Sequence, residues 1–363
     1  MSEKNIIDAW GDLDITDYDH LFKQFGMKKF EDLDISNHHI FKRKLIIAHR
    51  DFDRIKDSIV NKKRFAQITG IASSGQMHFG HKLDVDFFME FKKLGALSKF
   101  IVADIDAYLS RPDSKVPDMK KAKEVAVENV MDLLALGISK DDIFVQSRMC
   151  PEYFQLSFEC SKKITENQFK GIYGHINPGK LGAVLLQLSD ILFVQSDQVF
   201  GKCPTITGIG LEQDPHARAV RNVSKMINYD FTVPSFFYFT HQAGLKEGKK
   251  MSASTPDTAI LLSDSDKDVK KKINRAFTGG RETAEEQREI GGNSAVCKVY
   301  EMQKFHNPSD AELSEIDAKC KSGEMLCGEC KKKCIDYLHG FLGEHRTKRE
   351  SFKSDAEKMV YGK

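Results

Sequence analysis

Between residues 65 and 110 the chain alternates apolar segments with one amphipathic segment, and this order constrains the fold more than any other feature. Residues 65–69 (FAQIT) predict a strand that ends at Gly70. Residues 78–96 predict a helix, because apolar side chains recur at helical spacing along one stripe: Phe79, Leu83, Phe87 and Phe91. Residues 99–110 (KFIVADIDAYLS) predict a continuous apolar strand, typical of a parallel sheet. This βαβ order predicts an α/β fold with a doubly wound parallel sheet.

The rest of the chain first continues this alternation and then becomes helical. Further helices are predicted at 120–137 and 178–195, and further strands at 141–147 and 203–214. After residue 262 strand-like segments are almost absent and charged amphipathic helix dominates. We therefore predict three parts: a mostly helical N-terminal extension (1–64), a Rossmann-like domain with a connecting insertion (65–261) and a C-terminal α-helical domain (262–363).

Composition describes an ordinary globular chain of 363 residues, 40% hydrophobic and 30% charged. It has no run of eighteen apolar residues, and its first ten residues lack the apolar core of a secretory signal, so we expect a cytoplasmic protein without a membrane span. The net charge is only +2, but short basic runs such as VKKKINR (269–275) are frequent. Such runs are compatible with phosphate contact. Taken singly, each is better explained as a solvated helix face.

Four of the eight cysteines lie close together in the sequence: Cys320, Cys327, Cys330 and Cys334. Cysteines of a cytosolic chain stay reduced, so disulfides are not expected. Zinc at these four residues is possible, but only one C-x-x-C pair is present. The segment from 323 to 342 predicts one helix, with Cys330 and Cys334 on the same face. We therefore favour packed helix cysteines over a zinc site.

The motif His78-Phe79-Gly80-His81 stands where the first strand gives way to the helix. If the helix begins there, both imidazoles lie on its first turn, and the N-terminus of a helix attracts anions. Gly80 leaves the helix surface flat enough for a planar base, and Ser74 with its neighbours supplies hydroxyls. The position, at the carboxyl end of a sheet strand, favours a phosphate site. A helix cap is the alternative, and a metal site lacks further ligands at matching spacing.

A second motif, Lys250-Met251-Ser252-Ala253-Ser254, lies about 170 residues later in a segment rich in glycine and small hydroxyl residues. Such a loop can close on a triphosphate, with the lysine as a movable charge. Alone, each motif is better explained as a solvated surface turn or a helix cap. Together, in this order on one α/β framework, they favour nucleotide chemistry.

With these two motifs the chain resembles the class I aminoacyl-tRNA synthetases, and more closely the archaeal and eukaryotic branch of the tryptophanyl-tRNA synthetases. The resemblance covers most of the chain from residue 45 onward. Its supporting segments are HRDF (49–52), GLEQDPHARAVRNV (210–223), AFTGGRETAEEQREIGGN (276–293) and SGEMLCGECKK (322–332). The tyrosyl enzymes share the fold but usually have other residues at 213–215 and K-M-S-S-S in the second motif.

This resemblance implies a role for each matching residue. Lys250, His78 and His81 would be catalytic, and residues 262–363 would read the anticodon. The implied ATP-binding residues are Ser74, His78, Gly80, His81, Gly210, Lys250, Met251 and Ser252. The implied tryptophan-binding residues are Gly70, Asp106, Gln187 and Gln213, with Asp106 and Gln187 at the α-ammonium group. If the strand continues through residues 104–106, Asp104 and Asp106 point to one face.

Ile101 and Ala217 depart from the eukaryotic pattern of indole recognition, and Glu212 stands where the family commonly has Asp. The implied reaction needs ATP with Mg²⁺ and forms an aminoacyl-adenylate, which is then transferred to the 3′ end of tRNA(Trp). Because the substrate carboxylate is already ionised at pH 7, no general base is required. The family is usually homodimeric. The alternatives are a tyrosyl enzyme of the same class, a nucleotidyltransferase and a synthetase-like RNA-binding protein.

Overall fold

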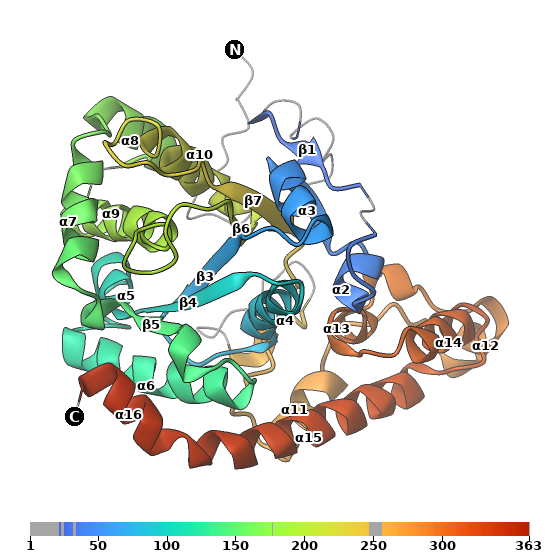
Figure 1. The fold of residues 1–363 in the computed structure, drawn as a ribbon. Coiled ribbons are helices and arrows are strands. Elements are labelled where there is room, and N and C mark those ends of the chain that lie inside the picture. The colour runs from blue at the N-terminus through green and yellow to red at the C-terminus, as the bar shows by residue number, and fades with distance from the viewer. Residues whose placement is uncertain (1–21, 23–24, 32–33, 176, 247–255, 363) are drawn as a thin grey trace.

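A seven-stranded sheet forms the centre of the protein, whose structure is a computed structural model that describes residues 22, 25–31, 34–175, 177–246 and 256–362 (Figure 1). The strands, in the spatial order of the sheet, are β1 (Lys28–Lys29), β2 (Ile46–Arg50), β7 (Ser235–Phe239), β6 (Thr205–Gly210), β3 (Ala66–Ala72), β4 (Leu97–Ala103) and β5 (Ile143–Val145). The five strands from β7 to β5 pair in parallel, and β2 is antiparallel to β7. The predicted α/β class with a doubly wound parallel sheet is confirmed.

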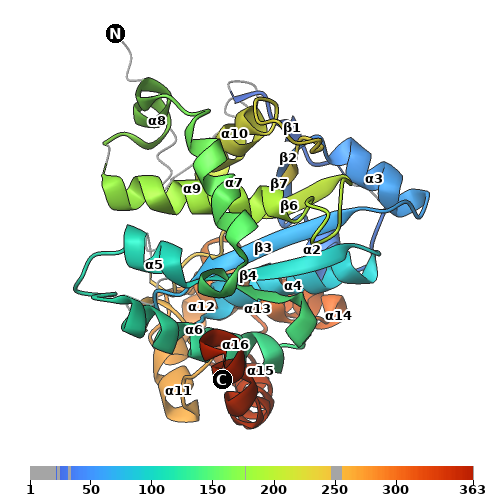
Figure 2. The same cartoon turned by 60° about the vertical axis from the view of Figure 1, so that its left-hand side comes forward.

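Helices cover both faces of this sheet. In the first two thirds of the chain the helices are α2 (His39–Lys42), α3 (Phe52–Val60), α4 (Phe79–Lys93), α5 (Asp104–Ser110), α6 (Met119–Ala135), α7 (Pro151–Ser161), α8 (Glu166–Tyr173), α9 (Pro178–Phe193) and α10 (Asp214–Val223). Figure 2 shows α7, α9 and α10 on one side of β3 and β4, and α6 on the other. Alternate side chains of β4 follow this division: Phe100 and Val102 pack with α4 and α6, whereas Ile101 packs with α9 and α10.

The C-terminal third is mostly helical, as predicted. Its helices are α11 (Asp266–Asn274), α12 (Ala284–Ile290), α13 (Lys298–His306), α14 (Asp310–Lys321), α15 (Cys327–Ser351) and α16 (Lys353–Tyr361). The long α15 runs beneath the sheet domain toward α6, where His345 and Arg349 both contact the buried carboxylate of Asp132, at 3.0 and 2.6 Å (Figure 1). None of the helices in the described ranges is long and apolar enough to cross a membrane.

Three details of the strands differ from the sequence-based expectation. β3 continues through Gly70 to Ala72 instead of ending at the glycine. The strand predicted over 99–110 is wrong in its second half, because β4 ends at Ala103 and helix α5 begins at Asp104. Asp104 and Asp106 therefore occupy the first turn of a helix and do not share one face of a strand. β2 and β7 were not predicted at all.

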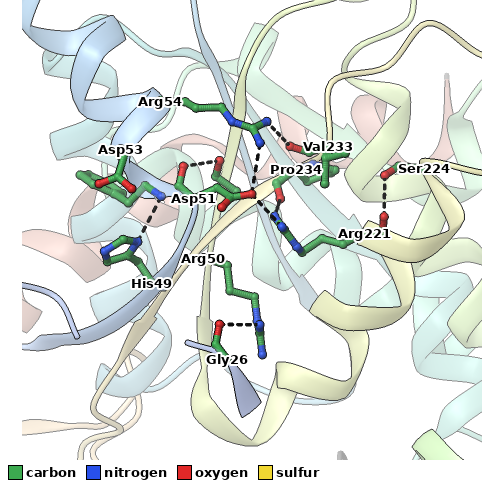
Figure 3. A network of polar contacts seen from close by, with 12 residues as sticks. Gly26, His49, Arg50, Asp51, Asp53, Arg54, Arg221, Ser224, Val233 and Pro234 are labelled. Carbon is green, nitrogen blue, oxygen red and sulfur yellow. Dashed lines mark hydrogen bonds and ion pairs between the residues drawn. The ribbon is translucent and has the colours of Figure 1, made fainter. Parts of the chain in front are cut away.

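A polar network fixes β2 and the start of α3 against α10 (Figure 3). Asp51, in the left-handed region at φ 55°, accepts hydrogen bonds from Arg54 and from Arg221 of α10, at 3.2 and 2.7 Å. On the neighbouring residue, the Arg50 guanidinium donates to the fully buried carboxylate of Asp214 at 2.9 and 3.0 Å. Removal of either member of this buried pair would leave the other charge without its counterion. The ion pair therefore fixes the N-terminus of α10 against β2.

Candidate active site

The sheet opens between β3 and β6, where the chain reverses its direction of winding. β3 pairs with β4 along its whole length but with β6 only at Ala66 and Gln67. Toward their carboxyl ends β3 and β6 therefore separate, and Gly70 is exposed although it lies in a central strand. A Cβ at Gly70 would lie 2.7 Å from the carbonyl oxygen of Ile101, so the strand pairing requires glycine there. Open α/β sheets bind ligands at such a switch point.

The two histidines of the first motif stack at the N-terminus of α4, on the carboxyl side of β3. Their ring centroids are 3.9 Å apart and nearly parallel, at 16°. His78 is the N-cap residue and its Nδ1 accepts a hydrogen bond from the Gly80 amide at 3.1 Å. The His81 Nδ1 accepts in turn from the His78 amide at 3.3 Å. The two histidines therefore lie on one helical turn, as predicted, and they also cap the helix, as the alternative interpretation expected.

These contacts fix the chemical form of the rings. A histidine that accepts at Nδ1 carries its proton on Nε2 and acts as a neutral N–H donor. Burial, together with the positive charge of Arg111, lowers the pKa of His81 to about 4, so the ring is neutral at pH 7. The pair can therefore offer N–H donors to phosphate oxygens next to a helix N-terminus without adding a positive charge.

The segment that follows the second motif is hydrogen bonded directly to the first. The Phe79 amide donates to the carbonyl of Ile260 at 3.1 Å, and the Leu262 amide donates to the carbonyl of Met77 at 2.9 Å. The residues with the motif's functional side chains, Lys250, Met251 and Ser252, lie outside the described residues. The Leu245 amide donates to the carbonyl of Thr258 at 2.9 Å, so the two ends of the intervening segment lie together. The chain thus returns from the second motif to the helix start that carries the histidines.

Three further polar residues, which the sequence alone did not single out as a group, meet at the end of β6. The His241 ring contacts Glu212 at 2.7 Å, just after Gly210. A Cβ at Gly210 would lie 1.9 Å from the His241 ring, so glycine is needed for this pair. Burial raises the pKa of Asp84 on α4 to about 7, with His241 opposing that shift and Glu212 adding to it. Gln213 follows at the start of α10.

A second polar group lies at the carboxyl ends of β4 and β5. The side-chain amide nitrogen of Gln146 donates to the Asp190 carboxylate at 3.1 Å. The side-chain amide oxygen of Gln146 accepts from the backbone amide of Asp106 at 2.8 Å. The Tyr153 hydroxyl donates to Asp190 at 2.5 Å. Gln187 precedes Asp190 by three residues on α9, so both lie on one helix face. The structure therefore joins Asp106 with Gln146, Tyr153 and Asp190 in one group, and Gln187 lies one helical turn before Asp190.

The two carboxyl groups of this group have raised pKa values. Burial raises the pKa of Asp106 to about 6, and burial with the nearby Asp106 carboxylate raises the pKa of Asp190 to about 7. A ligand cation that enters here would replace the lost hydration and favour the ionised acids. We conclude that the group suits an ammonium ion. No residue pattern could have identified Gln146 or Tyr153, because only tertiary packing brings them to α9.

The two residues that depart from the eukaryotic pattern, Ile101 and Ala217, are 3% and 0% exposed and belong to one apolar cluster. Ile68 and Leu188 belong to the same cluster. At both positions the chain therefore has a buried apolar side chain, packed on the side of the sheet that carries α9 and α10.

Comparison with known proteins finds similar proteins over nearly the whole chain. The family described as tRNA synthetases class I (W and Y) matches residues 60–343. The tryptophan–tRNA ligase of Methanocaldococcus jannaschii is 39% identical over 98% of each chain. The crystal structure of tryptophanyl-tRNA synthetase from Aeropyrum pernix has a TM-score of 0.89 and 37% identity over 97% of this chain and 98% of that one. The Plasmodium falciparum enzyme has a TM-score of 0.82 and 27% identity over 95% and 97%.

The identity to archaeal relatives and the stacked histidines at the switch point of a parallel sheet lead to one conclusion. The chain belongs to the class I tRNA synthetases of the tryptophan and tyrosine family, and within it to the tryptophan–tRNA ligases.

Proposed function

We propose that the chain is a tryptophan–tRNA ligase that activates L-tryptophan with ATP and transfers it to the 3′ end of tRNA(Trp). The geometric observation that carries the proposal is the placement of two different polar sites at neighbouring strand ends. Neutral N–H donors follow β3, and a buried acid group follows β4 and β5. Relatives named tryptophan–tRNA ligase, with nearly full-length alignments, support tryptophan as the amino acid.

In the activation step, the tryptophan carboxylate attacks the α-phosphorus of ATP and pyrophosphate leaves. The carboxylate is ionised at pH 7, so the protein must position the reactants and stabilise charge and need not remove a proton. His78 and His81 donate to the phosphate oxygens, and Lys250 supplies a positive charge as the pyrophosphate departs. Asp106, Asp190 and Gln187 hold the α-ammonium group. ATP enters with Mg²⁺, which neutralises part of the triphosphate charge.

In the transfer step, a ribose hydroxyl at the 3′ end of the tRNA attacks the aminoacyl-adenylate. Residues 262–363 read the anticodon in this proposal, and residues 65–261 carry the chemistry. Exposed lysines on the helices of the C-terminal third, such as Lys270 and Lys332, support phosphate contact there. The proposal includes a cytoplasmic location, which tRNA as the substrate supports.

The test of this proposal is ATP–pyrophosphate exchange with each of the twenty amino acids. We expect exchange with tryptophan alone, and charging of tRNA(Trp) in a second assay. Exchange with tyrosine in place of tryptophan would show that the chain is a tyrosyl enzyme of the same class. The absence of exchange with all twenty would leave a protein that only binds RNA, contrary to the proposal.

Tryptophan binding is expected to weaken as the pH falls through about 7. Asp190 has a raised pKa of about 7, so it is ionised above that pH and becomes protonated below it. Because the ammonium group binds to the ionised acid, the Kd for tryptophan should rise by about tenfold per pH unit below the pKa. Calorimetric titration between pH 5.5 and 8.5 measures this slope.

Two variants test whether Asp190 causes the pH dependence of tryptophan binding or whether a general loss of structure does. Asp190→Asn is expected to bind tryptophan about tenfold more weakly at pH 8 and to lose the pH dependence near pH 7, keeping only the weakening near pH 6 that Asp106 causes. Asp197→Asn, which changes an exposed carboxylate beyond the same helix, should keep both the affinity and the slope. A wild-type affinity that stays constant from pH 8.5 to 5.5 would remove Asp190 from the ammonium site.

The proposal includes a homodimer, and an exposed aromatic side chain on α7 supports it. Phe158 is 71% exposed, and its neighbour Glu159 accepts a hydrogen bond from the hydroxyl of Tyr229, which is 36% exposed. Burial of a phenyl ring against a second copy stabilises by about 1.5–3 kcal/mol. Phe158→Asp should therefore weaken the dimer by roughly tenfold or more, as measured by light scattering. Val60→Asp, at a residue 63% exposed on α3, is the control and should stay dimeric.

A further inference from the structure

The turn that leads from β3 to the histidine motif is held at its middle by a side chain from another helix. Residues 73–77 connect the end of β3 to the N-cap residue of α4. The side-chain amide nitrogen of Asn129, on α6, donates a hydrogen bond to the carbonyl oxygen of Gly75 at 3.0 Å. Asn129 is 1% exposed, so this contact is shielded from water. Because the turn contains Ser74, one of the implied ATP-binding residues, α6 supports the proposed phosphate site.

Backbone hydrogen bonds fix the two ends of this turn. The Ser73 amide donates to the carbonyl of Ala103 at 3.2 Å, and the Leu262 amide donates to the carbonyl of Met77 at 2.9 Å. The residues between these two points are partly or largely exposed. Within the described ranges, Asn129 supplies the only side-chain hydrogen bond to the backbone of this turn. The position of the middle of the turn therefore depends on α6.

Two buried polar atoms of these residues have no hydrogen-bond partner in the part of the chain that the structure describes. They are the hydroxyl oxygen of Ser73 and the side-chain amide oxygen of Asn129. A buried polar atom without a hydrogen bond lowers the stability of the fold. An apolar residue at position 129 would avoid this cost, so stability alone does not account for asparagine there. Its bond to the turn does.

A buried charge cluster fixes the same part of α6 against the C-terminal helix α15. Asp132 follows Asn129 by three residues, so the two side chains are neighbours on the helix surface. The Asp132 carboxylate accepts from Nε2 of His345 and from Nε of Arg349, at 3.0 and 2.6 Å. Arg349 also pairs with Glu128 of α6. A buried carboxylate is costly unless it is paired, and this cluster therefore joins α6 firmly to α15.

The helix α15 also contacts the histidine motif directly, through an aromatic ring. The ring of Phe341, one turn before His345, lies edge-on to the ring of Phe79, with centroids 5.4 Å apart at 62°. The rings of Phe341 and His345 are parallel within 10°. Phe79 belongs to the motif and is fully buried, and Figure 2 shows α15 and α16 beside α6. One face of α15 therefore supports the start of α4 and, through α6, the turn before it.

We propose that Asn129 is a positioning residue for ATP, and that Asp132 and His345 extend this support to α15. The Asn129 amide holds the Gly75 carbonyl, which keeps Ser74 and the free N–H groups at the start of α4 in place for the phosphate oxygens. None of the three residues touches a substrate in this arrangement. The inference rests on the proposed function, because it concerns the ATP site of the same reaction. It makes α15 a support of that site even in the absence of tRNA.

The test measures kcat and the KM values for ATP and tryptophan in pyrophosphate exchange by the full-length chain without tRNA. Asn129→Leu keeps the branching of the side chain and removes the donor. We expect it to raise the KM for ATP by about tenfold and to change the KM for tryptophan by less than about twofold. The control is Val130→Ala, at a fully buried core residue of the same helix, which should lower the unfolding temperature and keep both KM values. An unchanged KM for ATP in Asn129→Leu, with an active wild type, would overturn this inference and leave the proposed function intact.

A conservative pair and a double variant test the extension to α15. His345→Gln keeps a side-chain N–H donor for Asp132 and should retain the wild-type KM for ATP, whereas His345→Leu should raise it by about threefold. His339→Leu makes the same change at a partly exposed residue of the same helix and should have no effect. If Asn129 and His345 act through one turn, the double variant Asn129→Leu/His345→Leu should raise the KM by less than the product of the single effects. Equal KM values for His345→Gln and His345→Leu would contradict the role of α15.

Amide hydrogen exchange of residues 73–77 supplies a readout that does not depend on turnover, and it serves even where Asn129→Leu fails to fold. Exchange in this turn should be faster in His345→Leu than in the wild type and in His339→Leu, and ATP should slow it in the wild type. Equal exchange in all three proteins would overturn the inference. A wild type in which ATP binds, as shown by slower exchange, but tryptophan gives no pyrophosphate exchange would refute the proposed function instead.

Discussion

Replacing His81 with alanine is expected to lower the rate of tryptophan-dependent ATP–pyrophosphate exchange by about 10²- to 10³-fold. The ring is neutral and stacked on His78, and the hydrogen bond from the His78 amide to its Nδ1 fixes the proton on Nε2. A donor held in this way stabilises charge on the phosphate oxygens in the transition state without reorganisation. Loss of kcat should therefore exceed any change in the KM for tryptophan, as measured by the exchange assay.

Two comparisons separate this catalytic role from the role of His81 in the helix cap. The cap alone contributes about 1 kcal/mol to stability, which thermal unfolding of the variant measures. His339→Ala changes a histidine on α15 that contacts the Asp266 carbonyl, and it should leave exchange unchanged. Because the pKa of His81 is about 4, its contribution to kcat should persist as the pH falls from 8 to 6 at saturating tryptophan. If kcat instead falls as the pH is lowered, with a midpoint near pH 6.5 that is absent in His81→Ala, the ring becomes protonated near that pH and its pKa is not lowered to about 4.

The parallel strands β3 and β4 and the helix between them could be predicted because the information is local. The apolar segment at 65–69, the helical stripe after it and the next apolar segment each have the period of one element. The strand over residues 99–110 was overextended for the same reason. Ile105 and Tyr108 continue the apolar pattern, but the pattern cannot separate the last residues of a buried strand from the first turn of a buried helix.

The strands β2 and β7 could not be predicted, because their pairing is decided by contacts far along the chain. β2 lies antiparallel to β7, with His49 opposite Phe237, a separation of nearly 190 residues. β7 consists of five buried residues, too short for a periodic signal. Tertiary contacts of this kind override local propensity.

The part of the site that lies in one short sequence motif was predicted, whereas most of the part that comes from several distant segments was not. The histidine motif spans four residues, and its geometry was predicted correctly. The acid group draws Asp106, Gln146, Tyr153 and Asp190 from four separate elements, and of these only Asp106 was named, by resemblance.

Lys250→Ala is expected to lower kcat for adenylation by about 10²- to 10³-fold while tryptophan binding changes little. The lysine lies outside the described residues, but Leu245 and Thr258 join the two ends of its segment, and Leu262 is hydrogen bonded to Met77 beside the histidines. In the proposed mechanism, the positive charge of the lysine acts mainly on the negative charge that develops as pyrophosphate leaves. Single-turnover formation of the adenylate measures the step, and equilibrium titration measures tryptophan binding.

Lys249→Ala is the control for this prediction, because it removes the same charge from the adjacent residue of the same segment. If the effect depends on a specific position and not on the net charge of the segment, Lys249→Ala should lower kcat by less than about tenfold. Equal rates for Lys250→Ala and the wild type would show that pyrophosphate leaves without this lysine. In that case, the neutral donors on α4 and the Mg²⁺ bound to ATP would have to stabilise the leaving group alone, and the loss of rate in His81→Ala should then be larger than predicted above.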